Sequence, residues 1–315
     1  MASGVAAVLT ALRQRDYLSS ADCSAEETQG LLDLAGQLKS GARRIDLGNR
    51  VLGLIFSKAS TRTRVSFQVA MARLGGQTVD LNPSVTQLGR GEPVEDTARV
   101  LSRYCDVLAV RTFAQQEIVD YAHMATVPVL NALTDLEHPC QALADFLTMQ
   151  EEHGDLSGQT LAYIGDGNNV AHSLMLCGAL LGVNVRIACP EGFEPLPGVL
   201  DQARSLAQHG ATIDVLSDPG KAVAGAQAVY TDVWASMGQE QEQAEREQAF
   251  SGFCVDQALM DQAAPGAIVL HCLPAHRGEE ISAEVMEGPA SRIFDQAENR
   301  LHAQQALLAA VMGGL

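Results

Sequence analysis

The chain has 315 residues, of which 47% are hydrophobic and 19% charged, and its formal net charge is −17. This composition is typical of a soluble globular protein with one large or two ordinary domains, and the negative charge makes nucleic acid and anionic membranes poor partners. The sequence has no apolar run of the roughly 18 residues that a membrane helix needs and no signal-peptide pattern at its start, so we expect a cytoplasmic protein.

The first predicted element is a helix from Ser24 to Gly41, because a serine cap with a glutamate three residues later precedes leucines at helical spacing. Apolar runs and helical patterns then alternate four times, which indicates βα units and a parallel sheet covered on both faces. The predicted strands of this half are Val51–Phe56, Gln77–Leu81, Asp106–Arg111 and Val127–Asn131, and the helices after them are Thr61–Leu74, Val94–Tyr104, Gln115–His123 and His138–Glu152.

Residues 151–158 form a polar, glycine-marked break, so we place a domain boundary there and expect domains 1–150 and 151–315. A second alternating series follows, with predicted strands Thr160–Ile164, Val183–Ala188, Thr212–Leu216, Ala228–Asp232 and Ala267–Cys272, helices Asn169–Leu181 and Val199–His209, and a final helix Glu298–Val311. The expected fold class is α/β, with two domains that each hold a parallel sheet flanked by helices, and with the C-terminal helix packing back on the first domain.

The charges divide unevenly between the two halves. Residues 1–150 carry 14 basic and 16 acidic residues, whereas residues 151–315 carry 7 and 22, a balance of −15. This asymmetry suggests an anionic ligand in the first half and a cationic one in the second, although surface solubility is an adequate alternative for the acidic half. The seven cysteines include no C-x-x-C pair, which favours reduced thiols over a disulfide framework or a zinc ribbon.

The five residues Ser60–Arg64, S-T-R-T-R, lie between a predicted strand and a predicted helix. The first turn of a helix offers free backbone N–H groups and a positive dipole end, and the hydroxyl and guanidinium groups add further donors. We therefore interpret this stretch as an anion site, against the plainer interpretation of a helix cap followed by solvated arginines.

Other suggestive residues also follow predicted strands, where ligands of α/β sheets bind. Each has a plainer interpretation: an exposed arginine, a helix cap, a packed side chain or a buried cysteine. Residues 165–170, G-D-G-N-N-V, resemble the start of a dinucleotide fingerprint only weakly, because Val170 replaces the third glycine. The residues concerned are Arg111, His138, Gln141, Asn168, Asn169, Asp232, Ser236, Cys272 and Arg277.

Seven motifs, which follow one another along the chain in the order of the family, together resemble the aspartate/ornithine carbamoyltransferase family, most of all its anabolic, ornithine-using branch. They span nearly the whole chain. The motif D-x-x-x-S-M-G with H-C-L-P is similar to the ornithine branch rather than the aspartate branch. The seven are S-T-R-T-R at 60–64, Q-L-G-R-G-E at 87–92, H-P-C-Q at 138–141, G-D-G-N-N at 165–169, D-V-W-A-S-M-G at 232–238, H-C-L-P at 271–274 and E-N-R-L-H at 298–302.

The resemblance implies the substrates carbamoyl phosphate and L-ornithine, with no cofactor and no metal. It also implies a homotrimer with shared active sites, in which Gln87 reaches a neighbouring subunit. The residues implied for carbamoyl phosphate are Ser60, Thr61, Arg62, Thr63, Gln87, Arg111, His138, Gln141, Cys272, Leu273 and Arg300, the last three approaching it from the second domain. Those implied for ornithine are Asn169, Asp232, Ser236 and Met237.

The implied reaction is attack of the ornithine δ-amine on the carbamoyl carbon, which yields citrulline and phosphate for arginine biosynthesis. Cys272, Arg111 and His138 are the candidate catalytic residues, and the sequence leaves open whether Cys272 accepts a proton or positions other groups. Two alternatives remain: another acceptor amine, such as aspartate, putrescine or N-acylornithine, and, from another class, a dinucleotide-binding oxidoreductase.

Overall fold

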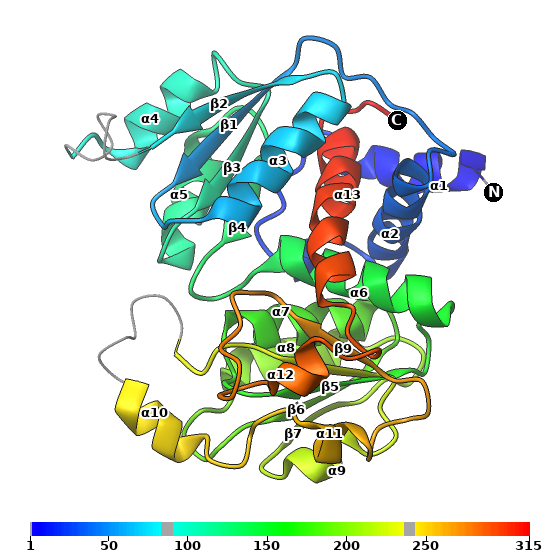
Figure 1. Ribbon diagram of the computed structural model, residues 1–315. Coiled ribbons are helices and arrows are strands. Elements are labelled where there is room, and N and C mark those ends of the chain that lie inside the picture. The colour runs from blue at the N-terminus through cyan, green and yellow to red at the C-terminus, as the bar shows by residue number, and fades with distance from the viewer. Residues whose placement is uncertain (1, 83–90, 236–242) are drawn as a thin grey trace. The chain divides into compact units, whose positions relative to one another are not determined.

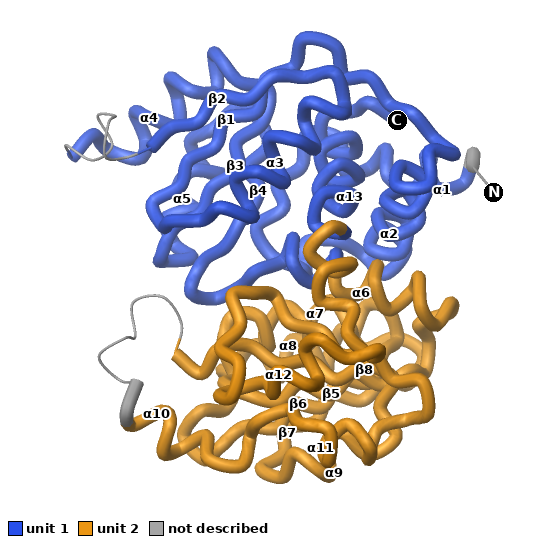
Figure 2. The backbone as a smooth tube through the Cα atoms, in the orientation of Figure 1, with its two compact units in different colours: residues 1–144, 299–315 blue, residues 145–298 orange. Residues whose placement is uncertain are grey.

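The computed structural model describes residues 2–82, 91–235 and 243–315. Contacts divide the chain into two compact units, of which unit 1 comprises residues 1–144 and 299–315 and unit 2 comprises residues 145–298 (Figure 2). Each unit contains one parallel sheet with helices, so the predicted α/β class with two domains is confirmed. Within the described ranges, every helix is too short or too polar to cross a bilayer.

Unit 1 is built on a four-stranded parallel sheet in the order β2–β1–β3–β4 (Figure 1). The inner strands are continuous apolar runs and are buried, whereas the edge strand β2 is partly exposed, as expected for a sheet with helices on both faces. The strands are β1 Val51–Phe56, β2 Gln77–Leu81, β3 Val107–Arg111 and β4 Val129–Leu133, and the α-helices that lie wholly in unit 1 are α1 Ala2–Leu9, α2 Ala25–Lys39, α3 Thr61–Arg73, α4 Val94–Leu101 and α5 Gln115–Met124.

One face of the unit 1 sheet is covered by α4 and α5. Ile118 and Tyr121 of α5 pack with Leu108 of β3 and Ile55 of β1, and all four side chains are fully buried. Burial of each large apolar side chain contributes about 1.5–3 kcal/mol, so this cluster fixes the central strands whose ends carry the candidate site.

Unit 2 contains a five-stranded parallel sheet in the order β7–β6–β5–β8–β9. Its strands are β5 Thr160–Ile164, β6 Asn184–Ala188, β7 Ile213–Leu216, β8 Ala228–Thr231 and β9 Ile268–His271. A cluster around Trp234 and Phe250, whose rings stack with centroids 5.7 Å apart, packs against strand residues such as Ile164. The helices are α7 Asn169–Leu180, α8 Pro197–Leu206, α9 Pro219–Val223, α10 Gln243–Ala249, α11 Gln257–Met260 and α12 Ala283–Met286.

Two helices, α6 (Pro139–His153) and α13 (Ile293–Val311), each continue from one unit into the other. The C-terminal part of α13 belongs to unit 1, as predicted for the C-terminal helix. It is held there by Arg50 Nη1, which donates to the carbonyl of Met312 at 2.6 Å, and by Lys39 Nζ, which donates to Asn299 Oδ1 at 2.8 Å. The units therefore change at residues 144 and 298, whereas the sequence placed one division at residue 150 and grouped residues 299–315 with the second half.

Candidate active site

Both sheets reverse their strand order at an inner position, between β1 and β3 in unit 1 and between β5 and β8 in unit 2. Ligands of such sheets bind outside the carboxyl ends of the strands at these switch points. The residues Ser60–Arg64 follow β1 and Arg111 ends β3. Asp232 follows β8, and Asn169 begins the helix after β5. The sequence thus placed a candidate cluster at each switch point without knowing the strand order.

The helix α3 begins at Thr61, as predicted, and Ser60 is its cap. Thr63 N–H donates to Ser60 Oγ at 3.2 Å, while Thr61 and Arg62 are exposed in the first turn. A cavity of about 570 Å³ adjoins this turn and is lined by residues 56–61, 64, 65 and 82. Its walls offer hydroxyl groups and the Lys58 ammonium, which are suitable donors for an oxyanion at a helix N-terminus, while the Arg64 guanidinium is paired with Asp80.

The buried guanidinium of Arg300 joins two other predicted residues of unit 1, Gln141 and Thr63. Its Nη1 donates to Gln141 Oε1 at 2.6 Å, and its Nη2 donates to Thr63 Oγ1 at 3.1 Å. Arg300 and Thr63 are separated by 237 positions in the chain, so folding brings together groups from α3, α6 and α13. Arg300 belongs to the second half of the chain in sequence, and its contacts group it with unit 1.

Arg111 and His138 are both buried in unit 1, and the charge of Arg111 acts on the His138 ring. Burial, with the positive charges of Arg300 and Arg111, holds the pKa of His138 well below its usual value of 6.5. Burial and the charge of Arg111 also lower the pKa of Lys58. His138 is therefore a neutral imidazole at pH 7, which can donate a hydrogen bond to a carbonyl oxygen through its single N–H group.

The depressed pKa of His138 predicts acid sensitivity of the fold. An unfolded histidine takes up a proton near pH 6.5, whereas the folded one does so only at lower pH, so the contribution of His138 is present above 6.5 and is lost as pH falls below it. The wild-type free energy of unfolding should fall more steeply between pH 6.5 and 5 than that of His138→Gln, by up to about 1.4 kcal/mol per pH unit. Urea denaturation at several pH values measures both slopes, and equal slopes would contradict the assignment.

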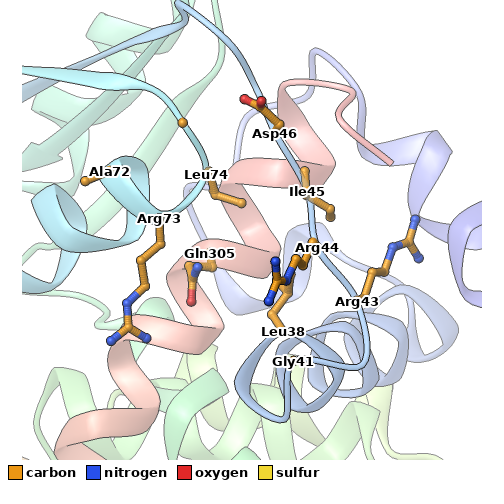
Figure 3. A pocket seen from close by; sticks show the side chains of 11 residues that line it. Leu38, Gly41, Arg43, Arg44, Ile45, Asp46, Ala72, Arg73, Leu74 and Gln305 are labelled. Carbon is orange, nitrogen blue, oxygen red and sulfur yellow. The ribbon is translucent and has the colours of Figure 1, made fainter.

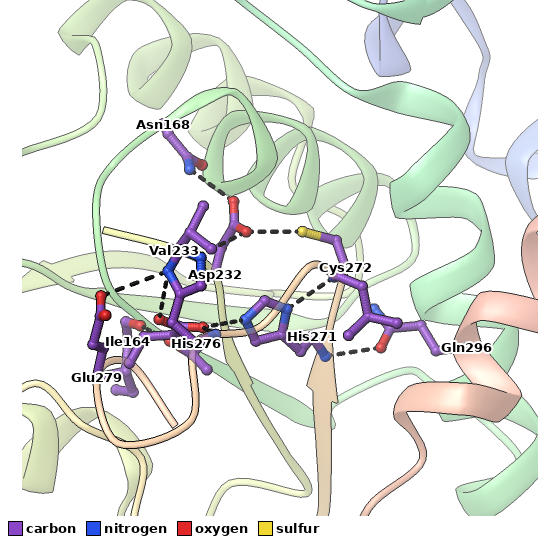
Figure 4. A network of polar contacts seen from close by, with 12 residues as sticks. Ile164, Asn168, Asp232, Val233, His271, Cys272, His276, Glu279 and Gln296 are labelled. Carbon is purple, nitrogen blue, oxygen red and sulfur yellow. Dashed lines mark hydrogen bonds and ion pairs between the residues drawn. The ribbon is translucent and has the colours of Figure 1, made fainter. Parts of the chain in front are cut away.

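In unit 2, the side chain of Asp232 is the centre of a hydrogen-bond network (Figure 4). Its Oδ1 accepts from Val233 N–H at 2.8 Å and from the thiol of Cys272 at 3.0 Å, and its Oδ2 accepts from Asn168 Nδ2 at 3.0 Å. The carboxylate is buried, and these three donors are all uncharged. This fixed negative charge is suited to bind an ammonium group.

The thiol of Cys272 is a hydrogen-bond donor in this network. Burial, with the neighbouring carboxylates of Asp232 and Asp145, raises the pKa of Cys272 well above its ordinary value. A thiol with a raised pKa keeps its proton at neutral pH and is a poor general base. Of the two roles left open by the sequence, this geometry favours positioning of Asp232 over proton acceptance.

The loop of residues 165–169 serves the fold and this network. Asn168 caps α7 by accepting from Val170 N–H at 2.9 Å, and the same side chain donates to Asp232. A Cβ on Gly167 would collide with the backbone at Glu194 and Pro195, so this glycine permits packing of the chain on itself. Val170, at the position where a dinucleotide fingerprint has its third glycine, has a buried side chain that packs in the core.

The remaining predicted residues are placed as follows. Gln87, Ser236 and Met237 lie outside the described residues. Asn169 is half-buried as the first residue of α7. Lys58, in the wall of the first cavity, and Glu280, which accepts from His271, were not predicted from the sequence. Asn168 was named, but its contact with Asp232 was not predicted. Only Asn168 had a local signal, since it lies inside a recognised motif.

Two groups of side chains in the described part of the chain have metal-ligand chemistry. One comprises Asp232, His271 and Cys272, and the other His276, Glu279 and Glu280. In the first, both ring nitrogens of His271 already have hydrogen-bond partners, Leu273 N–H and Glu280 Oε1. In the second, Glu280 Oε1 accepts from His271 and from His276 N–H. Both sets are explained by hydrogen bonding.

A second cavity of about 570 Å³ in unit 1 involves none of the predicted residues. It lies between the C-terminal ends of α2 and α3, and the side chain of Gln305 from α13 lies between those of Arg44 and Arg73 (Figure 3). Its arginines, such as Arg44 and Arg73, belong to none of the motifs recognised in the sequence.

Comparison with known proteins finds a family model for each half of the chain. Residues 15–151 match the family model described as "Aspartate/ornithine carbamoyltransferase, carbamoyl-P binding domain", and residues 157–311 match "Aspartate/ornithine carbamoyltransferase, Asp/Orn binding domain". The chain is 85% identical to an ornithine carbamoyltransferase of Parasynechococcus marenigrum over 100% of this chain and 99% of that one. It is 78% identical to the enzyme of that name from Prochlorococcus marinus strain MIT 9313, over 99% and 98%.

Solved structures agree. The ornithine carbamoyltransferase of Pyrococcus furiosus matches with a TM-score of 0.92 and 50% identity over 96% of this chain and 99% of that chain. The one from Gloeobacter violaceus matches with a TM-score of 0.88 and 56% identity over 96% and 100%. The resemblance inferred from the seven motifs is therefore confirmed over the full length. The chain belongs to the aspartate/ornithine carbamoyltransferase family.

Proposed function

We propose that this chain transfers the carbamoyl group of carbamoyl phosphate to the δ-amine of L-ornithine and forms L-citrulline and phosphate, a step of arginine biosynthesis in the cytoplasm. The observation that carries the proposal is the pair of switch-point clusters, which are guanidinium and hydroxyl groups in unit 1 and a carboxylate network in unit 2. This chemistry matches an anionic donor and a cationic acceptor. The relatives named above support ornithine as that acceptor.

The donor half of the site is assigned to unit 1. The phosphate is bound by the first turn of α3, with Ser60, Thr61, Arg62 and Thr63, and by Arg111. The carbamoyl group is bound by His138, Gln141 and Arg300, all of which are buried, and Arg300 also donates to Thr63 and Gln141. Neutral His138 polarises the carbonyl oxygen, and the arginines stabilise the charge that develops on the phosphate.

The acceptor half is assigned to unit 2. Asp232 pairs with an ammonium group of ornithine, and Asn169, Ser236 and Met237 contact the remainder of the amino acid. Cys272 and Leu273 approach the carbamoyl group. The acidic balance of residues 151–315 favours a cation there, and Asn168, Val233 and Cys272 keep the Asp232 carboxylate oriented.

The proton that the amine loses must be accepted by another group, either Cys272 or the departing phosphate. The δ-amine has a lysine-like pKa near ~10.4, so forming the neutral nucleophile at pH 7 costs roughly 4.6 kcal/mol. The neutral amine forms the N–C bond, the C–O bond to phosphate breaks, and the nitrogen loses one proton as the phosphate gains one. The departing phosphate can therefore accept that proton, and Cys272 keeps its own in the bond to Asp232.

A pair of substitutions tests this role of Cys272. Cys272→Ala should lower kcat about 10-fold to 100-fold, because Asp232 loses one of the donors that orient it. Cys272→Ser should restore most of the rate, because a hydroxyl donates to a carboxylate at least as well as a thiol does. Steady-state rates of both variants provide the measurement. A serine variant as slow as the alanine variant would contradict positioning through this hydrogen bond.

The active enzyme is a homotrimer, in which Gln87 of one copy reaches the site of the next. Exposed apolar side chains on unit 1 support assembly: Val65 and Val69 on α3 are 50% and 37% exposed, and Val79 on the edge strand β2 is 45% exposed. A partly exposed edge with apolar side chains is a surface that a partner usually covers. Light scattering of the purified chain would give the mass, and a monomer at working concentration would refute the assembly.

The decisive experiment measures citrulline formation from carbamoyl phosphate by the purified chain. L-Ornithine should be used far better than aspartate, putrescine or N-acetylornithine at equal concentration. Preference for one of these amines would keep the family and change the acceptor. No carbamoyl transfer to any of the four would refute the proposal.

A further inference from the structure

We propose that His271 and Glu280 form a buried pair that positions the turn at Cys272 and Leu273. They act as positioning residues, because neither is assigned to contact a substrate. The inference rests on the proposed function for its kinetic readout, while its chemical readout below is independent of activity.

The two side chains are joined in the interior of unit 2. His271 ends β9 and is 1% exposed, Glu280 is 0% exposed, and His271 Nε2 lies 3.0 Å from Glu280 Oε1. The other ring nitrogen, Nδ1, accepts from Leu273 N–H at 2.9 Å. Because Nδ1 is an acceptor, the ring proton must be on Nε2, so His271 donates to Glu280. Figure 4 shows a contact at each nitrogen of this ring.

The bond from Leu273 N–H holds an unusual backbone conformation. Leu273 has φ of +60°, in the left-handed region that a leucine rarely adopts. The surroundings must fix such a residue, since an L side chain disfavours it. His271 supplies this restraint two residues before it, and Glu280 fixes which nitrogen of His271 faces the turn.

Glu280 also closes the rest of the loop. Its Oε1 accepts from His276 N–H at 2.6 Å, so a single carboxylate oxygen joins the strand end at residue 271 to residue 276. The backbone of His271 has a separate anchor, because its N–H donates to Gln296 Oε1 at 2.8 Å. The strand end would therefore stay in place without Glu280, whereas the histidine ring and the turn would not.

The position of the turn matters because Cys272 lies within it. Its neighbours on both sides, His271 and Leu273, are fixed by the bonds described above, and its thiol reaches Asp232 Oδ1 at 3.0 Å. Loss of the pair should thus release the thiol from Asp232 and disturb the groups that face the substrates, without removing any of them.

Two near-isosteric substitutions of Glu280 provide the test. Glu280→Gln keeps an oxygen that accepts from His271 and His276, whereas Glu280→Met keeps the volume and loses the acceptor. We expect kcat for citrulline formation to fall 10-fold or more in Glu280→Met and less than about 3-fold in Glu280→Gln. Alkylation of Cys272 by iodoacetamide, followed by peptide mass spectrometry, should be faster in Glu280→Met by at least 5-fold. Glu279→Gln, at the partly exposed neighbour, is the matched control and should match wild type.

A second pair of variants tests the histidine. His271→Asn keeps an oxygen for Leu273 N–H in an Asx turn, and His271→Phe keeps a ring without acceptors. His271→Asn should retain a higher kcat and show slower Cys272 alkylation than His271→Phe.

Equal kcat and alkylation rates in Glu280→Met and Glu280→Gln would overturn the proposal, as would equal losses in both His271 variants. If Glu280→Met or His271→Phe fails to fold, as judged by thermal melting, His271→Asn alone decides: alkylation of its Cys272 as fast as in urea overturns the proposal. If wild type makes no citrulline, the proposed function fails, and alkylation still tests the pair.

Discussion

Replacing Arg111 with alanine is expected to raise the KM for carbamoyl phosphate by about 100-fold or more, with a smaller fall in kcat. Arg111 ends β3 at the switch point, is nearly buried, and is paired in register with Phe56 at the end of β1. Removing one partner of a buried, charge-assisted interaction typically costs about 2–5 kcal/mol, which corresponds to roughly 30-fold to several thousand-fold in affinity. Steady-state kinetics at saturating ornithine measures the effect.

Two further variants make this experiment specific. Arg111→Lys keeps the charge and loses the two-pronged donor, so it should fall between alanine and wild type. Arg103→Ala removes an exposed arginine of the same unit and should leave the KM within about 2-fold, which controls for net charge. A KM close to wild type in Arg111→Ala would remove Arg111 from the phosphate site.

Arg111→Ala should also have an electrostatic effect that can be measured without an activity assay. Burial, Arg300 and Arg111 together hold the pKa of His138 down, so loss of the Arg111 charge should raise that pKa toward its ordinary range. Titration of the His138 ring by NMR would detect the change. The binding and titration results together would separate loss of a phosphate contact from general disruption of the fold.

Much of the fold was predictable because the central strands are uninterrupted apolar runs. Thr160–Ile164 was predicted with the bounds that the structure has, and Val51–Phe56 likewise. Short elements of unit 2, such as α11 and α12, were missed, since one helical turn carries too little periodicity. The N-terminal helix α1 was also missed. Leu9 at its end packs against Gly30 of α2, a contact that a local pattern does not encode.

The candidate site was predictable to the extent that its residues follow strands. Parallel strands place their carboxyl ends at one edge, so Arg111 and Asp232 could be expected at the edge of a sheet. Contacts between distant positions could not be expected. The Thr63–Arg300 bond depends on where the C-terminal helix returns, and the Asn168–Asp232 bond depends on β5 lying next to β8. Glu280 carried no signal because its role comes from complete burial beside His271.

The second large effect is expected at Asp232. Asp232→Asn should lower kcat/KM for ornithine about 1000-fold, while carbamoyl phosphate binding stays within about 3-fold of wild type. The asparagine has the same shape and can still accept from Val233 N–H and from Cys272 with its one oxygen. It offers no negative charge to an ammonium group, and its NH2 group can no longer accept from Asn168. The expected loss of about 4 kcal/mol lies within the range for leaving a buried charge unpaired.

A control variant determines whether this loss is local. Residues 151–315 carry a balance of −15, so any acidic residue there contributes to the attraction of a cation. Asp201→Asn removes the same charge from an exposed position on α8 and should change kcat/KM for ornithine by less than about 2-fold, because solvent screens it. Similar losses in the two variants would indicate that ornithine is attracted by the general field. A loss confined to Asp232→Asn, with carbamoyl phosphate binding intact by calorimetry, would support a division in which unit 2 selects the amine and unit 1 holds the donor. Equal loss of both substrates would contradict that division.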